Sequence, residues 1–312
     1  MRRAFPLIAV GALLSGCAGG PLHRAVPQAA GAAAVTHSPA PAARASAKPK
    51  ASAKPTKPVK PSASPVPTLL MPPLMGDSSF SALSGRRAAE ANPLYATGRA
   101  AARCRLSAPR QDSWKSLRRY LDAVSGCLDR LWSRQFGAAR LYFTPPERVY
   151  ARHKVKGTPC GTMPSDDATG TYCGANRTYY LLIEPPYSRP WSTAWLAELT
   201  AHEYGHHVQN MSYILDYETR LYSDSTTKAQ EDLASRRLEL QAECLAGVAA
   251  RGMGSAMAPW REFADDYIGE QDKKWRLDHG ELATQLRWLK RGYDSGSPRT
   301  CNTWTAAKKD VT

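Results

Sequence analysis

The stretch "ELTAHEYGHHVQN", Glu198 to Asn210, places two histidines four residues apart, with a glutamate directly after the first of them. The apolar spacing from Ser192 to Tyr222 is that of an α-helix, so His202 and His206 project from one helical face. Two imidazoles on one face can bind a single metal ion, and Glu203 beside them can act as a general base toward water. The pattern predicts a catalytic metal site whose third protein ligand lies elsewhere in the chain.

The segment "RRLELQAECLAGVAA", residues 236–250, is the best source of that ligand. Glu239 and Glu243 are again four residues apart on an expected helix whose surroundings carry few charges, and buried carboxylates need a cation or a hydrogen-bond donor. One carboxylate would complete a His₂Glu ligand set, and the other would accept a hydrogen bond from a ligand imidazole and fix its orientation. The spacing leaves open which glutamate has which role. The alternative is two solvated helix glutamates.

The N-terminus has the features of an export signal. "MRRAFPLIAVGALLSGCAGG" begins with positive charge, continues with a short apolar run and ends in small residues. Leu14 to Cys17 resembles the bacterial lipobox, which implies cleavage before the cysteine and its lipidation. We therefore expect residues 1–16 to be a lipoprotein signal peptide and Cys17 to anchor the chain to the extracytoplasmic face of the cell membrane. An ordinary secretory signal is the alternative, and the N-terminal arginine pair does not decide between the general and twin-arginine routes.

Residues 17–78 are rich in alanine, proline, lysine and serine and offer little to bury, which predicts a disordered linker of about 60 residues. Nine of the 42 Lys and Arg residues precede residue 76, whereas all 27 Asp and Glu residues follow it. The net charge of +15 therefore belongs mostly to the leader and linker. It suits an anionic membrane or wall polymer, and no nucleic-acid-binding motif accompanies it.

Six cysteines remain besides Cys17, and an even number in an exported protein predicts three disulfides. Proximity in sequence favours Cys104–Cys127 and Cys160–Cys173, which leaves Cys244–Cys301. A cysteine zinc site is the competing interpretation, but the chain has no CxxC pair.

Hydrophobic periodicity after the linker favours an α+β domain over residues 79–312, mostly helical with a small sheet. Expected helices cover Gln111–Phe136, Ser192–Tyr222, Lys228–Ala250, Pro259–Ile268 and Asp278–Arg291, the last closed by Gly292. Expected strands lie near Leu141–Phe143, Val149–Ala151 and Thr178–Ile183.

Two motifs together, "HEYGHHVQ" at residues 202–209 and "ELQAEC" at residues 239–244, resemble the bacterial neutral zinc metallopeptidase family. The similarity includes "TYCGANRTYYL" and residues 278–301, and it spans Arg110 to Cys301. HExxH followed by ExxxD on another helix is the general gluzincin pattern, and the resemblance implies a zincin-like catalytic domain. This chain has glutamate where the family has aspartate, at Glu243, which leaves room for the two glutamates to exchange roles.

The resemblance implies one Zn²⁺ held by His202, His206 and Glu239, with Glu243 orienting a ligand. Glu203 would be the general base in hydrolysis of a peptide or protein substrate. His279 and Tyr293 lie in the matching C-terminal segment and are candidate donors to the oxyanion.

Two alternatives stay open. One is a catalytically inactive, zinc-stabilised surface protein that serves as a binding module or scaffold. The other is a hydrolase of wall peptides or of another amide. Substrate specificity and oligomeric state cannot be derived from these motifs.

Overall fold

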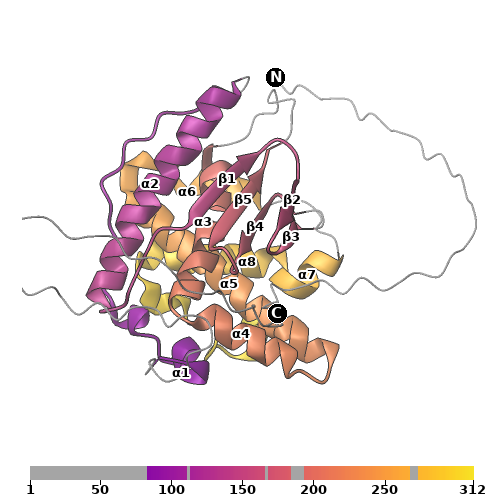
Figure 1. The fold of residues 1–312 in the computed structure, drawn as a ribbon. Coiled ribbons are helices and arrows are strands. Elements are labelled where there is room, and N and C mark those ends of the chain that lie inside the picture. Colours follow the sequence, from indigo (N-terminus) through magenta and orange to yellow (C-terminus); the bar gives the residue numbers. More distant parts are fainter. Residues whose placement is uncertain (1–82, 111–112, 166–167, 184–192, 268–272) are drawn as a thin grey trace, which may run out of the picture.

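The computed structural model describes residues 83–110, 113–165, 168–183, 193–267 and 273–312 (Figure 1). The expected signal peptide, Cys17 and the expected linker lie outside these residues. The described chain folds into helices with a small mixed sheet, which confirms the predicted α+β class. None of its helices is both long enough and apolar enough to cross a bilayer.

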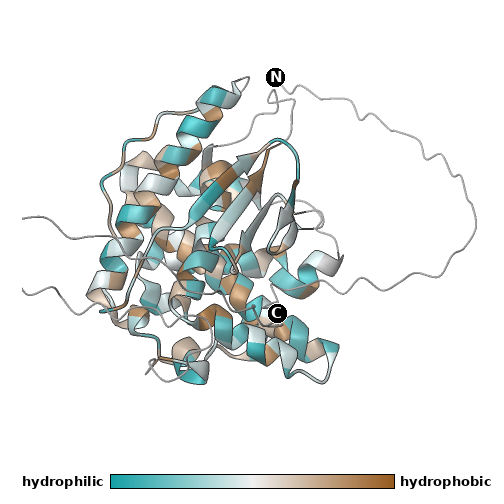
Figure 2. Ribbon diagram, viewed as in Figure 1, coloured by the Kyte–Doolittle hydropathy of each residue, from teal (hydrophilic) through white to brown (hydrophobic). Residues whose placement is uncertain are grey.

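The helices form most of the domain, and short 3₁₀ turns join several of them. In chain order they are α1 (Gly85–Glu90), η1 (Pro93–Ala96), α2 (Trp114–Ala138), α3 (Thr193–Met211), α4 (Ile214–Ser223), α5 (Lys228–Met253), η2 (Gly254–Ala256), α6 (Trp260–Asp266), α7 (Lys273–His279), α8 (Leu282–Ser295), η3 (Pro298–Cys301) and η4 (Lys308–Val311). Helix α5 runs through the core and packs against α3, α4, α7 and α8. Figure 2 shows how hydrophilic and hydrophobic residues are distributed over these elements.

The main sheet has three strands in the order β1-β5-β4. Its central strand β5 (Thr178–Leu182) is buried at every position, parallel to β1 (Glu147–Ala151) and antiparallel to β4 (Gly170–Cys173). A separate two-stranded ribbon, β2 (Val155–Thr158) with β3 (Gly161–Met163), occupies the loop between β1 and β4. Strand β4 is therefore an edge strand among the described residues.

The predicted strand at Leu141–Phe143 is wrong, since the chain there has no regular structure. Pro145 and Pro146 follow directly and disfavour continued strand pairing, because proline has no N–H and restricts the residue before it. The segment instead contributes an aromatic side chain to the core, since the ring of Phe143 packs against that of Phe136 with centroids 4.8 Å apart.

The predicted single helix from Ser192 to Tyr222 is divided in two. Tyr213 takes a left-handed conformation, with φ of 64°, and ends the continuity between α3 and α4. The side-chain amide of Asn92 donates to the carbonyl oxygen of Ser212 at 3.0 Å, so a distant residue satisfies the carbonyl group at the break. The expected start of this helix at Ser192 lies outside the described residues.

Hydrogen bonds join the first described segment to the last one. Asn302 donates its side-chain amide to the carbonyl of Glu90 at 2.9 Å, although the two residues are 212 positions apart. Ser297 donates its hydroxyl to the carbonyl of Thr97 at 3.1 Å, over 200 positions. The segment before α2 therefore packs with the segment after α8.

Three disulfides join Cys104 to Cys127, Cys160 to Cys173 and Cys244 to Cys301, which are the pairs that proximity in sequence favours. The first ties the segment before α2 to that helix, the second ties the β2–β3 turn to β4, and the third ties α5 to η3.

The prediction that Gly292 closes a helix is wrong. Helix α8 continues to Ser295, and Gly296 follows it in the left-handed conformation, with φ of 63°. Gly292 instead lies where α8 crosses α5, and a Cβ there would overlap the carbonyl of Cys244. Gly247 on α5 makes the reciprocal contact with the backbone of α8. The expected helix Asp278–Arg291 also divides, because Gly280, with φ of 83°, separates α7 from α8.

Substitution Gly292→Ala is expected to lower the free energy of unfolding by about 1–3 kcal/mol or more, because the added methyl group forces two helix backbones apart. Gly137→Ala is the matched control, since a Cβ at Gly137 in α2 meets no atom within 4 Å. Urea unfolding followed by circular dichroism measures both. Equal midpoints for Gly292→Ala and wild type would show that the α5–α8 crossing tolerates the methyl group.

Candidate metal centre

Small residues bring α3 and α5 together at the predicted site. A Cβ placed on Gly205 would lie 3.1 Å from the Cα of Ala242 on α5, which is tighter than ordinary van der Waals contact. Glycine in the middle of a helix costs roughly 1 kcal/mol relative to alanine, and here it permits the close approach of a neighbouring backbone. The two helices carrying the predicted ligands therefore face each other at short range.

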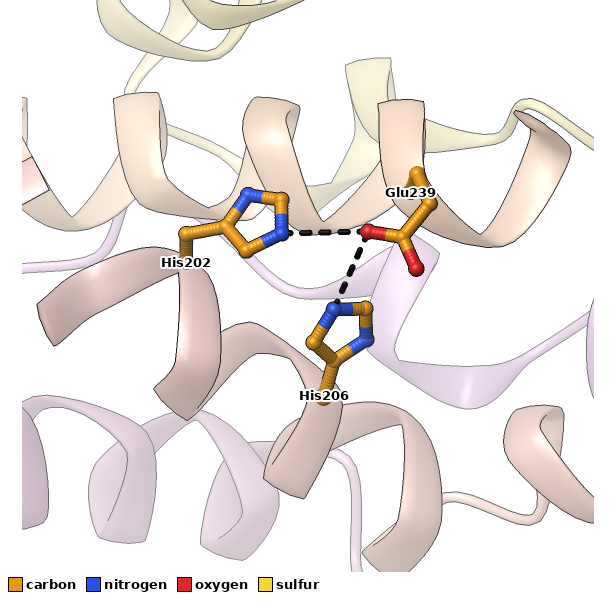
Figure 3. Close-up of side chains that lie close together, drawn as sticks. All are labelled: His202, His206 and Glu239. Atoms are coloured by element: carbon orange, nitrogen blue, oxygen red, sulfur yellow. Dashed lines mark hydrogen bonds and ion pairs between the residues drawn. The ribbon is translucent and has the colours of Figure 1, made fainter. Parts of the chain in front are cut away.

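Both predicted imidazoles meet one carboxylate oxygen across this contact (Figure 3). The Nε2 atom of His202 lies 3.1 Å from Oε2 of Glu239, and the Nε2 atom of His206 lies 3.2 Å from the same oxygen. The three ligand atoms lie within 4.8 Å of one another. Two imidazole nitrogens and one carboxylate oxygen form the donor set of many catalytic zinc sites, so these residues fit the ion.

The electrostatics of the group also suit a cation. Burial disfavours the charged form of Glu239, but the imidazoles around it outweigh burial and hold the pKa of that carboxyl well below its ordinary value. Burial lowers the pKa of His202 and His206, yet the adjacent carboxylates more than offset it and raise both. Protons on the imidazoles thus supply the positive charge that this half-buried carboxylate requires, and a divalent cation can replace them.

Glu203 has a free carboxylate oxygen beside this group. Its side chain is buried, and Oε2 has no hydrogen-bond partner among the described residues. Burial raises the pKa of Glu203 above its ordinary value. A Cβ on Gly170, the first residue of β4, would lie 2.5 Å from Oε1 of Glu203, so the strand backbone presses directly on this carboxylate. An orphaned buried carboxylate oxygen of this kind can accept a proton.

The outer nitrogen of His202 faces a second pair of carboxylates. Its Nδ1 atom lies 3.7 Å from Oε1 of Glu243, which places Glu243 behind the imidazole, away from the oxygen of Glu239. The hydroxyl of Tyr267 lies 2.8 Å from the same Glu243 oxygen and 3.3 Å from Oε1 of Glu198. Burial, followed by the charge of Glu243, raises the pKa of Glu198 well above its ordinary value. This arrangement suits Glu243 as the residue that orients His202.

His206 is oriented by an amide that sequence reasoning missed. The Nε2 group of Gln209 donates to the carbonyl of Leu238 at 2.7 Å, which turns the amide oxygen toward His206. That oxygen lies 2.9 Å from Nδ1 of His206, so this nitrogen carries the hydrogen and Nε2 keeps its lone pair for a metal. Gln209 is fully buried, so solvent does not compete for these bonds.

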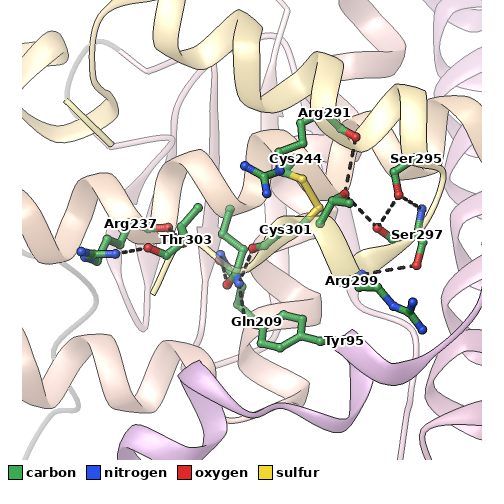
Figure 4. Close-up of a disulfide and its surroundings, with 12 residues drawn as sticks. Tyr95, Gln209, Arg237, Cys244, Arg291, Ser295, Ser297, Arg299, Cys301 and Thr303 are labelled. Carbon is green, nitrogen blue, oxygen red and sulfur yellow. Dashed lines mark hydrogen bonds between the residues drawn. A yellow bond between two sulfur atoms is a disulfide. The ribbon is translucent and has the colours of Figure 1, made fainter. Parts of the chain in front are cut away.

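A second buried amide holds Gln209 in place (Figure 4). The Nε2 group of Gln209 also reaches Oε1 of Gln241 at 3.1 Å. Gln241 in turn donates to the hydroxyl of Tyr95 at 2.7 Å and to the carbonyl of Cys301 at 2.9 Å. The orientation of His206 therefore depends on a hydrogen-bonded chain that ends beside the Cys244–Cys301 disulfide.

His207 has a packing role, because both of its ring nitrogens are used away from the centre. Nε2 donates to the carbonyl of Thr144 at 2.7 Å, and Nδ1 accepts from the hydroxyl of Tyr172 at 3.0 Å. Burial lowers the pKa of His207 to about 4 and keeps the ring neutral. The residue ties α3 to β4 and thereby fixes the strand that presses on Glu203.

His279 approaches the centre, whereas Tyr293 does not. The Nε2 atom of His279 lies 3.4 Å from Oε2 of Glu239, and its ring stacks on Trp275 with centroids 3.7 Å apart. The ring of Tyr293 packs against Trp260 at 5.2 Å and lies 5.7 Å from the guanidinium of Arg251. Arg251 is about 18 Å along α5 from Glu239, at 1.5 Å per residue. The sequence expectation for Tyr293 therefore has no support in the geometry.

Three further residues near the centre were not predicted. Glu198 is four residues before His202 and shares its helical face, so the spacing that located the histidines could have found it. Tyr267 is remote in sequence from every motif residue, and no local pattern marks it. Glu218 on α4 is buried, and its pKa is raised to about 7, first by burial and then by the charge of Glu239.

The comparison with known families agrees with this geometry. The family model described as "Putative neutral zinc metallopeptidase" matches residues 95–304. The chain belongs to this family. The matched region contains both α3 and α5, which carry the candidate ligands, and the family implies zinc and suggests a hydrolase.

Similar proteins occur in distant bacteria. YpfJ of Escherichia coli (strain K12) is 27% identical over 206 residues, which cover 60% of this chain and 71% of that protein. Rv2575 of Mycobacterium tuberculosis (strain ATCC 25618 / H37Rv) is 26% identical over 219 residues, which cover 59% of this chain and 70% of that protein. Both carry the name "Uncharacterized protein", so neither assigns a substrate. No solved structure matches the chain.

Gln209→Leu is expected to weaken zinc binding by about 10- to 100-fold, because the substitution removes the acceptor that orients a ligand imidazole. Gln209→Glu keeps an acceptor and should bind zinc more tightly than Gln209→Leu. Competition with a chromogenic chelator measures the affinity, and Gln135→Leu serves as a control at a buried glutamine of α2. Wild-type affinity in Gln209→Leu would show that this amide does not position His206.

Glu218 makes stability depend on pH in the metal-free protein. A folded-state pKa of about 7 lies above the ordinary value of 4.5, so the folded state favours the protonated acid. Its stabilising contribution is complete below pH 4.5 and is lost as the pH rises through 7. The difference between the two pKa values corresponds to roughly 3 kcal/mol of folding free energy, because a shift of one pKa unit is worth about 1.4 kcal/mol.

Glu218→Gln keeps the shape of the neutral acid, so its advantage over wild type should grow from pH 5 to pH 8 toward about 3 kcal/mol. Urea unfolding of chelator-treated protein measures this difference in unfolding free energy, and Glu262→Gln, at an exposed position, serves as the control. A constant difference between Glu218→Gln and wild type over this range would contradict the burial of an acidic group at this position.

Proposed function

We propose that the chain is an exported, membrane-anchored zinc peptidase that hydrolyses peptide bonds. His202, His206 and Glu239 are the zinc ligands, and Glu203 is the general base. The observation that carries the proposal is the meeting of two imidazole Nε2 atoms at one oxygen of Glu239, beside a glutamate with an unpaired buried oxygen. Family membership supports the same chemistry.

Each residue of the centre has a defined task in this reaction. Zinc, when bound, would polarise the scissile carbonyl and make water a better nucleophile. Glu203 takes a proton from that water at its free oxygen and gives it to the leaving amine. Its raised pKa suits this transfer, because burial strengthens the hold of the carboxylate on the proton between the two events.

The outer contacts keep the ligands in place. The carboxylate of Glu243 lies 3.7 Å from the outer nitrogen of His202, and Gln209 accepts a hydrogen bond from that of His206, so both imidazoles present Nε2 to the ion. His279 is the candidate donor to the oxyanion: its ring lies beside Glu239, and its buried Nδ1 has no partner among the described residues.

The sheet beside Glu203 favours an extended peptide as substrate. Edge strands offer unpaired N–H and C=O groups, and an extended peptide can bind there by adding a strand. Strand β4 is an edge strand among the described residues, and its Gly170 lies directly against Glu203. A peptide that lies along β4 therefore passes the general base, which supports a peptide or protein substrate over a small molecule.

Export and anchoring rest on separate support. Three disulfides are typical of proteins outside the reducing cytosol. The lipobox-like Leu14 to Cys17 supplies a site for lipid, and the expected linker gives the domain reach above the membrane. The proposed location is therefore the extracytoplasmic face of the cell membrane.

Glu203→Gln is expected to keep wild-type zinc content and to lose hydrolysis by about 10²- to 10⁴-fold, because it removes the proton acceptor and leaves the ligands unchanged. Zinc content is measured by atomic absorption, and hydrolysis with a library of quenched fluorescent peptides. Chelation should abolish the activity of wild type, and added zinc should restore it.

Two results would count against the proposal. Hydrolysis by Glu203→Gln at the wild-type rate would remove Glu203 from the mechanism. Zinc-loaded wild type that cleaves no peptide in the library would favour the inactive scaffold.

A further inference from the structure

The net positive charge of the sequence after residue 75 comes from one segment. Residues 99–140 contain ten basic and three acidic side chains, whereas the rest of the chain from residue 76 contains 23 basic and 24 acidic ones. The excess positive charge after the linker therefore comes entirely from α2 and the segment that precedes it.

The arginines of this segment are exposed along α2 and the chain before it, and Arg119, Arg130 and Arg134 lie within about 60° of one another around the helix. Arg118, Arg119, Arg130 and Arg134 are exposed on α2, and Arg103 and Arg105 are exposed on the preceding segment. We name these six residues the α2 basic face. Figure 1 shows α2 along one side of the domain, and Figure 2 shows hydrophilic residues along the helix.

Direct contacts hold the preceding segment against α2. Arg134 donates to the carbonyl of Ala101 at 3.1 Å, and the Cys104–Cys127 disulfide joins the segment to the helix covalently. A shallow depression of about 540 Å³ lies around that disulfide, and Arg103, Arg105 and Arg130 line it. The arginines of the α2 basic face therefore come from two parts of the chain that a disulfide and a hydrogen bond hold together.

Acidic residues do not neutralise this face. None of its six arginines makes an ion pair with another described residue. Asp122 is exposed there, but Asp129 is engaged by Arg148 at 3.0 Å and by the hydroxyl of Tyr204 at 2.9 Å. Guanidinium groups that lack carboxylate partners are well suited to phosphate.

The α2 basic face lies on the far side of α3 from the metal centre. Tyr204 points from α3 to α2, whereas His202 and His206 point from α3 to α5. Each histidine is two residues from Tyr204, or about 200° around the helix. Glu218, Glu231 and Asp278 lie near Tyr222 at the end of α4, together with Lys228, which pairs with Glu231.

We infer that the α2 basic face docks on a bilayer surface rich in anionic lipid headgroups and holds the metal centre turned away from the bilayer. Helix α2 has 25 residues and is therefore about 37 Å long, so the face can contact many phosphates at once. Each arginine near an anionic membrane contributes roughly 1 kcal/mol, which makes the sum of several contacts substantial.

The test uses the full-length, zinc-loaded chain with Cys17→Ser, so that no lipid anchor contributes. The variant carries Arg118→Gln, Arg119→Gln, Arg130→Gln and Arg134→Gln. The matched control removes the same charge elsewhere, by Arg87→Gln, Arg299→Gln, Lys308→Gln and Lys309→Gln, all at exposed positions. Co-sedimentation with phosphatidylglycerol vesicles measures partitioning, and phosphatidylcholine vesicles provide the neutral surface.

The parent chain and the matched control are expected to bind the anionic vesicles, and the variant about 600-fold less, from roughly fivefold for each of the four charges. Binding should fall with added salt, because salt screens exposed charges. The four single variants, each expected to lose about fivefold, keep the test valid if the quadruple variant fails to fold.

Equal binding of the variant and the control to phosphatidylglycerol vesicles would overturn the proposal. It would indicate that the linker, and not the α2 basic face, binds the vesicles. Retention on soluble poly(glycerol phosphate) without vesicle binding would also overturn it, in favour of an anionic polymer. Since no readout uses hydrolysis, the outcome is independent of the proposed peptidase activity.

Discussion

The attraction between the half-buried carboxylate of Glu239 and two imidazoles, across the contact of α3 with α5, is the interaction on which the centre depends. An isolated charge that is largely removed from water would be costly, so Glu239 needs positive charge beside it. Gly205 and Ala242 allow the two helix backbones to come close enough for that meeting. Helix packing and metal chemistry are therefore set by the same short contact.

The surrounding residues orient the two imidazole rings. Each imidazole has an oxygen near its outer nitrogen, a carboxylate oxygen at 3.7 Å for His202 and a hydrogen-bonded amide oxygen at 2.9 Å for His206. A carboxylate pair and a chain of buried glutamines are different chemical solutions to one requirement, which is to fix the tautomer of a ligand. Because the amide chain leads to the carbonyl of Cys301, the C-terminal part of the fold supports the centre from a distance.

Local periodicity was sufficient to predict the helices that carry the centre and the α+β class, since side chains four residues apart share a helical face. It could not predict the break at Tyr213, which depends on an amide from Asn92, over a hundred residues away in the chain. Gly292 resembles a helix end in sequence, and only the crossing with α5 explains it. Gln209 lies within the histidine motif, but its role depends on the carbonyl of Leu238, which the sequence does not place beside it.

The hydrogen bond between Asn302 and Glu90 has a consequence for the order of folding. A polypeptide that is synthesised from its N-terminus exposes the segment near Glu90 long before Asn302 is available to bind it. This part of the domain cannot close until residues more than 200 positions later have been made. The segment before α2 therefore joins the fold late, after the helices that carry the metal centre have been synthesised.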